Sequence, residues 1–165
     1  MVEKVKSMML RAATPVDRDF LLSVFASTRE AELAALAWAP EQSRAFLQMQ
    51  FNVQQQSYDA RYPDAENSII LLSDRPIGRM LVRRSDTTIE LVDVALLSEY
   101  RNRGIGTALI RGLMAEAVAT QKPLDLWVYV TNPARRLYQR LGFTKIEEES
   151  LYARMRWLPA DTSAS

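Results

Sequence analysis

Residues Arg101–Thr107, with the sequence Arg-Asn-Arg-Gly-Ile-Gly-Thr, combine two glycines with two arginines. Glycine lets a backbone approach a ligand closely, and the free N–H groups at the start of a helix attract phosphate. Arginine side chains beside such groups add charge-assisted donors. The segment is therefore a candidate phosphate-binding turn, although a turn without any ligand between a strand and a helix has the same local pattern.

Two familiar phosphate motifs do not match this turn. A dinucleotide-binding fingerprint needs glycine or alanine three residues after Gly106, where the chain has Leu109. A P-loop needs Gly-Lys-Ser or Gly-Lys-Thr, whereas Gly106 is followed by Thr107 and Ala108. The turn must therefore belong to another class of phosphate site or to no site at all.

The composition limits the chemistry that can accompany this turn. The 165 residues include no histidine and no cysteine, which excludes Ser-His-Asp triads, Cys-His pairs, Cys/His zinc sites and disulfides. Acid–base chemistry must come from Asp, Glu, Lys, Tyr, a terminus or water. The 21 basic and 20 acidic residues nearly balance, so we expect no nucleic-acid partner. We expect no metal site, signal peptide or membrane-spanning segment, and a cytoplasmic location.

Apolar periodicity predicts the elements before the turn. Thr14-Pro15-Val16-Asp17 has the pattern of a helix start, with Thr14 as the cap. The alanine-rich residues 31–37 are helical or form a corner between helices. The sequence predicts a strand at 8–12, a helix at 41–59, and then three strands in an antiparallel meander at 68–73, 77–84 and 88–97.

The elements after the turn follow from the same patterns. A strong helix pattern covers 104–120, and the strand at 124–130 is apolar on both faces except for Asp125. A helix begins at Asn132-Pro133 and closes at Gly142, before two final strands at 143–149 and 151–157. The order β-α-α-β-β-β-α-β-α-β-β predicts one mixed α/β (α+β) domain, and the crossover helix predicts that strands 88–97 and 124–130 are parallel.

Two motifs in this chain resemble signatures of the GNAT superfamily of CoA-dependent N-acyltransferases. The first, Arg/Gln-x-x-Gly-x-Gly/Ala after a strand, is matched by residues 101–106. The second, an Asn followed by Leu-Tyr-x-x-Leu-Gly-Phe, is matched by Asn132 and residues 137–143. The resemblance implies a single GNAT-like domain over residues 1–158, followed by a frayed tail at 159–165. Its central sheet would be mostly antiparallel, with one parallel, splayed pair of strands.

The resemblance also implies acetyl-CoA (coenzyme A) as the cofactor. Backbone N–H groups of the turn would hold the pyrophosphate. The strand before the turn would pair with the pantetheine arm where it splays from residues 126–129. Asn132 serves equally well as a plain helix cap, and the two roles are compatible. The cofactor-binding candidates are Val94, Ala95, Leu96, Arg101, Asn102, Arg103, Gly104, Ile105, Gly106, Thr107, Asn132, Ala134 and Tyr138.

Tyr138 and Glu90 are the catalytic candidates that the resemblance supplies. Tyr138 matches the family tyrosine near the thioester sulfur, and a phenol with a pKa of about 10 can protonate a departing thiolate. Glu90 lies eleven residues before Arg101, where some family members keep a catalytic glutamate. Strand alternation places Glu90 and Asp93 on opposite faces. The alternatives are core packing for Tyr138, and for Glu90 a charged strand end at the sheet rim, with water as the base.

In the family, the acceptor amine is bound by the first two helices and by the ends of the central strands. The candidates here are Trp38, Phe46, Gln50, Tyr58, Trp127 and Tyr129, although packing alone explains most such side chains. The expected activity is direct transfer of an acetyl group from acetyl-CoA to the primary amine of a small molecule, in a ternary complex.

Other functions and partners stay open. A protein N-terminus or lysine is the alternative acceptor. Residues 127–130, Trp-Val-Tyr-Val, lack the glutamate that relatives acting on protein N-termini often carry, which disfavours that acceptor. A non-catalytic module that binds or senses acyl-CoA is the alternative from another class. A homodimer is an open alternative to a monomer.

Overall fold

The computed structural model describes residues 7–160. All but the first two residues of the expected C-terminal tail, 159–165, lie outside that range, as do the first six residues. The described chain forms two compact units. The first comprises residues up to Leu81 together with Val94–Gly106, and the second comprises Val82–Asp93 together with the residues from Thr107 on.

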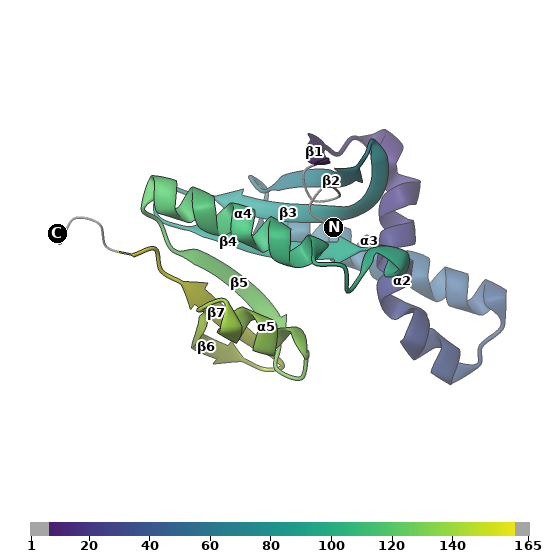
Figure 1. The fold of residues 1–165 in the computed structure, drawn as a ribbon. Helices are drawn as coiled ribbons and strands as arrows, with labels where there is room; N and C mark the ends of the chain where they lie inside the picture. The colour runs from purple at the N-terminus through teal and green to yellow at the C-terminus, as the bar shows by residue number, and fades with distance from the viewer. Residues whose placement is uncertain (1–6, 161–165) are drawn as a thin grey trace. The chain divides into compact units, whose positions relative to one another are not determined.

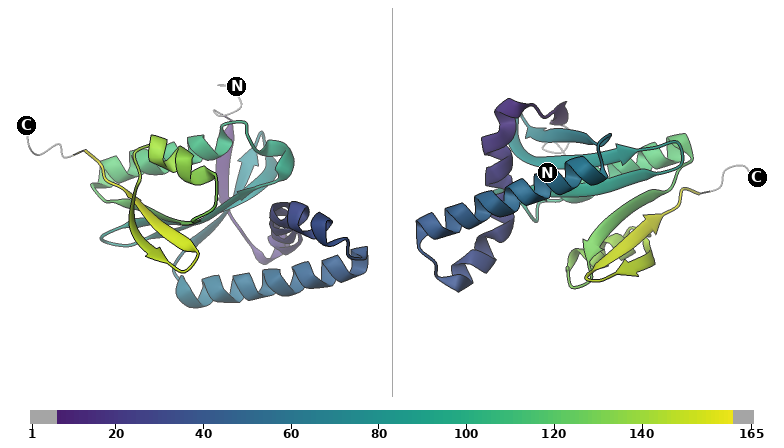
Figure 2. Two further views of the ribbon diagram at one scale, coloured as in Figure 1. Left: turned by 90° about the horizontal axis from the view of Figure 1, so that it is seen from below. Right: turned by 180° about the vertical axis from the view of Figure 1, so that it is seen from behind.

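The first unit begins with the strand β1 (Met8–Ala12), a 3₁₀ turn (Pro15–Asp17) and two long helices, α2 (Arg18–Leu36) and α3 (Pro40–Arg61). Figures 1 and 2 show α2 and α3 joined by a short turn. That turn needs a left-handed residue, Ala37, which has φ 52°. Strand β2 (Glu66–Leu72) follows and pairs antiparallel with β1. Leu21 and Phe25 of α2, Phe51 of α3 and Ile69 of β2 form the buried cluster that holds the helices on the strands.

An ion pair fixes the entry to α2. Arg11 donates from Nη1 and Nη2 to the two carboxylate oxygens of Asp17, both at 2.8 Å. The backbone N–H of Thr14 donates to Asp17 Oδ2, also at 2.8 Å. The expected cap at Thr14 is thus built around Asp17, which lies three residues further on and closes the 3₁₀ turn before the helix.

Strands β3 (Arg75–Arg84) and β4 (Ile89–Leu96) each run through both units, and a 3₁₀ turn (Ser98–Tyr100) follows β4. Helix α4 (Ile105–Thr120) leads to β5 (Leu124–Tyr129), and α5 (Ala134–Arg140) leads to the hairpin of β6 (Thr144–Glu149) and β7 (Tyr152–Trp157). Figure 1 shows α5 beside this hairpin. The short α5 ends at Gly142, whose φ of 104° favours glycine and whose Cβ position lies 3.2 Å from Trp157 Cδ1.

The strand order in the sheet is β1-β2-β3-β4-β5-β7-β6. Strands β4 and β5 are parallel from Ile89↔Leu124 to Leu91↔Leu126, and β7 pairs antiparallel with β5 and with β6. The edge strand β6 is exposed along its whole length, carries three consecutive glutamates, and shifts register between Lys145 and Glu147. The mixed fold, the order of elements and the single parallel pair agree with the expectation from sequence.

The differences from the expected elements concern their ends, residues 31–36 and one short turn. Helix α3 extends to Arg61, and residues 31–36 continue α2 rather than forming a corner. The 3₁₀ turn after β4 is not predicted by the sequence pattern. Helix α5 begins at Ala134, although Pro133 already has helical angles. No helix within residues 7–160 combines the length and the hydropathy that a membrane crossing requires.

Candidate functional site

The turn after β4 belongs to the first unit up to Gly106 and presents backbone N–H groups at the start of α4. The N–H of Arg101 is occupied, because it donates to the carbonyl of Ser98 at 3.2 Å. Asn102 and Gly104 have positive φ, 60° and 79°, so two residues of the loop adopt the left-handed conformation. Helix α4 begins directly afterwards, so the N–H groups of its first turn lack intrahelical acceptors. Such a loop and helix start form an anion-binding concavity.

The two glycines of the turn have different reasons to be glycine. Gly104 has a left-handed φ that a side chain would strain. Gly106 has an ordinary φ, and a Cβ added there would meet no heavy atom within 4 Å. Packing within the chain therefore does not require glycine at position 106. The open space beside the first turn of α4 is a place where a ligand can approach the backbone.

The two arginines of the turn differ in what their side chains contact. Arg101 Nε donates to the carbonyl of Leu96 at 3.1 Å, and its Nη2 donates to Ser27 Oγ at 3.1 Å. The same hydroxyl accepts from the backbone N–H of Ser98 at 2.9 Å. Arg101 thus ties the turn to α2 of the first unit, which is a structural role that its position in the motif does not predict. Arg103 is exposed and lies over the ring of Tyr100, 5.5 Å from its centroid.

The end of β4 lies tightly against β3 in the first unit. A Cβ on Gly78 would come within 2.3 Å of the carbonyl oxygen of Ala95 and 2.9 Å of Leu96 Cδ2. Glycine at position 78 therefore permits the close approach of β3 to the half-buried residues Val94–Leu96. These are the residues expected to pair with the pantetheine arm.

In the second unit, Tyr138 lies on α5, with its ring tilted against Phe143 at a centroid distance of 6.0 Å. Burial raises the pKa of the Tyr138 phenol, and the negative charge of Asp93 raises it further. A raised pKa keeps the phenol protonated at neutral pH, as a proton donor requires. Asn132 acts as a cap, because its Oδ1 accepts from the N–H of Ala134 at 2.9 Å. The half-buried Ala134 is the first residue of the same helix.

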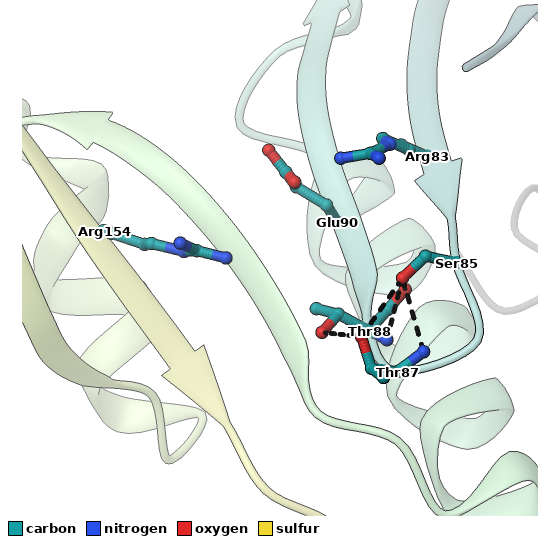
Figure 3. A pocket seen from close by; sticks show the side chains of 6 residues that line it. All are labelled: Arg83, Ser85, Thr87, Thr88, Glu90 and Arg154. Atoms are coloured by element: carbon teal, nitrogen blue, oxygen red, sulfur yellow. Dashed lines mark hydrogen bonds between the residues drawn. The ribbon is translucent and has the colours of Figure 1, made fainter. Parts of the chain in front are cut away.

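Glu90 lies in a polar hollow of the second unit, near the start of β4. The residue as a whole has an exposed fraction of 9%, while its carboxylate oxygens keep accessible surface in the hollow. No hydrogen bond or ion pair reaches it from the rest of residues 7–160. The hollow has a volume of about 340 Å³ and is shown in Figure 3. Its lining residues are Arg83, Ser85, Thr87, Thr88, Glu90 and Arg154.

Behind the hollow is a buried carboxylate held by two arginines. Asp125 is the register partner of Glu90 on β5 and is fully buried. Its Oδ2 accepts from Arg154 Nε at 3.0 Å and from Arg154 Nη2 at 2.7 Å. Arg156 donates from Nε to Oδ1 at 2.7 Å and from Nη2 to Oδ2 at 2.9 Å. The two guanidinium groups therefore neutralise Asp125, and Arg154 also forms a longer ion pair with Glu147, 3.7 Å from its Nη1.

The aromatic acceptor candidates divide between the two units. In the first unit, Trp38 packs edge-on against Phe46 at 5.1 Å, and the Arg79 guanidinium lies 5.3 Å from the centroid of Tyr58. Gln50 is half-buried on the same helix as Phe46 and Tyr58.

In the second unit, Tyr129 stacks on Tyr152 at 4.3 Å. Arg154 lies over Trp127, with 5.7 Å between the guanidinium carbon and the ring centroid. The structure therefore brings Trp127 next to the arginine of the hollow.

Arg83 and Arg154 are functional candidates that the sequence reasoning missed. The sequence does indicate that arginine or lysine must lie near Asp125. This residue is the single charge in an apolar strand, and a buried carboxylate requires cationic partners. Arg154 and Arg156 alternate with the buried Ala153 and Met155 on β7, which identifies them as residues of one face. Residues 7–160 contain no cluster of three or more side chains that could hold a metal ion.

Comparisons with known proteins agree with this fold and with the two motifs. A model of the acetyltransferase (GNAT) family matches residues 24–143. An N-alpha-acetyltransferase of Sulfurisphaera tokodaii is 40% identical over 60 residues. That match spans 34% of this chain and 36% of the relative, about a third of each.

Two solved structures share the fold at low sequence identity. The PaiA N-acetyltransferase of Thermoplasma acidophilum, solved in complex with coenzyme A, is 16% identical and superposes with a TM-score of 0.66. The superposition covers 92% of this chain and 99% of the PaiA chain. An acetyltransferase of Thermus thermophilus is 18% identical with a TM-score of 0.66, covering 94% and 99%. The family match extends over most of the chain and includes both motifs, and the chain therefore belongs to the acetyltransferase (GNAT) family.

Proposed function

We propose that this protein is an N-acetyltransferase that moves an acetyl group from acetyl-CoA to a primary amine. The observation that carries the proposal is the turn of residues 101–107. It combines free backbone N–H groups with open space at Gly106, in a chain that belongs to an acetyltransferase family. The coenzyme A bound to the Thermoplasma relative supports the same cofactor.

The residues of the turn fit a pyrophosphate. The N–H groups of residues 102–107 would hold it, because the N–H of Arg101 is already bonded to Ser98. The exposed Arg103 can add a charge-assisted donor, whereas Arg101 holds the turn in place through Ser27. Strand residues Val94–Leu96 would bind the pantetheine arm through their backbone. Acetyl-CoA supplies a thioester carbonyl that an amine can attack and a thiolate that can leave.

The proton transfers have candidates among this chain's own residues. The attacking amine must lose a proton, and Glu90 or a water molecule would accept it. The new C–N bond forms as the C–S bond breaks, and Tyr138 would donate its phenolic proton to the leaving sulfur. Tyr138 suits this role because its raised pKa keeps it protonated. No covalent bond to the enzyme is needed, consistent with the absence of cysteine and histidine.

We propose a small-molecule amine as the acceptor. The polar hollow at Glu90 has the size of a small ligand, which supports this choice. The N-alpha-acetyltransferase from Sulfurisphaera tokodaii supports a protein N-terminus as the second candidate. A lysine acceptor and a module without turnover are further alternatives, and a proton donor such as Tyr138 has no purpose in the latter.

Thermal unfolding with acetyl-CoA tests the cofactor assignment. At 100 times its dissociation constant, the ligand should stabilise the protein by about 2.7 kcal/mol. Gly106→Leu should abolish the shift by filling the space beside the turn. Gly112→Leu is the matched control, because a Cβ there also meets no heavy atom within 4 Å.

No shift in the unsubstituted protein would overturn the cofactor assignment. An equal shift in both variants would remove the turn from the binding site. Release of free thiol from acetyl-CoA with a panel of amines then separates an enzyme from a binding module.

A further inference from the structure

The hollow at Glu90 offers both a negative and a positive group to one ligand. We infer that it binds an acceptor that is zwitterionic, a small amino acid whose ammonium group contacts Glu90 and whose carboxylate contacts Arg154. The inference rests on the proposed acetyltransferase function and names the class of its acceptor. Figure 3 shows Glu90 and Arg154 pointing into the hollow from different strands, β4 and β7.

Glu90 is the anchor for the positive end of the ligand. Its exposed fraction is only 9%, and none of the described residues bonds to its carboxylate. The carboxylate oxygens keep accessible surface in the hollow, where a cationic partner can reach them and form a charge-assisted contact. A ligand ammonium group in the hollow supplies that partner. Acetylation removes the positive charge of the amine, so the product loses this contact and can leave.

Arg154 is the anchor for the negative end, and the protein fixes it in advance. Asp125 accepts from its Nε and Nη2, and its guanidinium lies over the ring of Trp127. Its Nη1 forms an ion pair with the exposed Glu147 at 3.7 Å, which is longer than a hydrogen bond and leaves the Nη1 N–H groups without a close acceptor. The outer edge of the guanidinium can therefore donate to a carboxylate without losing its contacts to Asp125.

The charges of the hollow favour an amino acid over the other amine classes. A polyamine carries two or more positive charges, whereas Glu90 is the only carboxylate among the six lining residues, so a second ammonium group would have no carboxylate there to contact. A peptide N-terminus or a lysine side chain in a protein has no adjacent carboxylate for Arg154. A free amino acid presents both charges within a few bonds, and it fits a volume of about 340 Å³.

The test compares free amino acids with their amides, which keep the amine and the side chain but lose the carboxylate. Binding to the coenzyme A-saturated protein is measured by calorimetry, and kcat/KM is measured by thiol release from acetyl-CoA. For at least one side chain, the amino acid should bind and react about 10- to 100-fold better than its amide, the range expected for a charge-assisted contact. A panel of polyamines and peptides is assayed in parallel.

Variants at β7 identify the residue responsible. Arg154→Gln should remove the preference for the acid over the amide, mainly through KM, and Arg154→Lys should restore part of it. Arg156→Gln is the matched control, because it also loses two hydrogen bonds to Asp125 while Arg156 does not line the hollow. The Arg156→Gln variant should still prefer the free amino acid over its amide.

Equal use of acids and amides, or a preference for polyamines or peptides, would overturn the inference while leaving the acetyltransferase function intact. An Arg154→Gln variant that still prefers the amino acid over its amide would also overturn the inference. Absence of thiol release with every amine would instead contradict the proposed function. The calorimetric comparison needs no turnover, so failure of every amino acid to bind would overturn the inference in that case too.

Discussion

Replacing Gly78 with alanine should destabilise the protein by forcing β3 away from β4. The added Cβ would lie 2.3 Å from the carbonyl oxygen of Ala95 and 2.9 Å from Leu96 Cδ2. The Leu96 side chain can turn aside, but the backbone carbonyl cannot. The strands must therefore separate by about 1 Å to reach an ordinary contact distance. Overpacking of this kind costs about 1–3 kcal/mol, and the lower entropy of the unfolded alanine chain offsets about 0.4–1 kcal/mol.

Gly112→Ala is the matched control for Gly78→Ala. Gly112 is exposed on α4, and a Cβ there meets no heavy atom within 4 Å. Because alanine favours a helix over glycine, this variant should gain about 0.5–1 kcal/mol. Replacing glycine with alanine is thus expected to lower the free energy of unfolding at position 78 and to raise it at position 112.

Urea unfolding followed by circular dichroism measures both free energies. In thermal scans, each kcal/mol corresponds to about 2–4 °C for a chain of this size. Gly78→Ala should also weaken acetyl-CoA binding, because the displaced residues are those proposed to pair with pantetheine. A Gly78→Ala variant as stable as the unsubstituted protein would refute the close strand approach on which this reasoning depends.

Three further predictions concern charged and titrating groups. Tyr138→Phe should lower kcat about 10-fold or more while acetyl-CoA affinity is kept. Because burial and Asp93 raise the Tyr138 pKa above 10.0, the alkaline loss of kcat in the unsubstituted enzyme should lie above that pH; an unchanged kcat in the variant would remove Tyr138 from the mechanism. Asp125→Asn removes the buried carboxylate that two partly exposed guanidinium groups share and should cost about 2–4 kcal/mol in urea unfolding; a neutral effect would contradict the buried charge cluster. The Arg11 guanidinium and then the Thr14 N–H hold the pKa of Asp17 well below its usual range. Its stabilising contribution is therefore full at neutral pH and is lost as the pH falls below about 4. The stability difference between Asp17→Asn and the unsubstituted protein should shrink from pH 7 toward pH 2, and a constant difference would exclude this account.

Local patterns in the sequence predict most of the fold because the period of apolar residues changes clearly from helix to strand. The order of elements and the parallel pairing of β4 with β5 both follow from such patterns. The 3₁₀ turn at Ser98–Tyr100 is not predicted, because three residues are too few to show a period.

The contacts within the candidate site depend on long-range pairing that local patterns do not contain. Arg101 donates to Ser27, which lies 74 residues earlier, so its structural role is visible only when α2 is in place. Arg154 reaches Asp125 only in the register that pairs β7 with β5. The sequence marks Asp125 as an exception in an apolar strand, but it does not say which arginines accompany it.

The acidic edge strand β6 has a consequence for how copies of this chain meet. A strand at the end of a sheet has backbone groups that a second copy can extend into a continuous sheet. Here an antiparallel approach of two β6 strands would bring Glu147, Glu148 and Glu149 of one copy close to the same carboxylates of the other. Lys145 and Arg154 balance part of this charge, and repulsion between the remaining carboxylates, together with the irregular register near Lys145, would disfavour pairing of two copies through this edge. Charged side chains on an edge strand are one of the means by which proteins discourage edge-to-edge pairing.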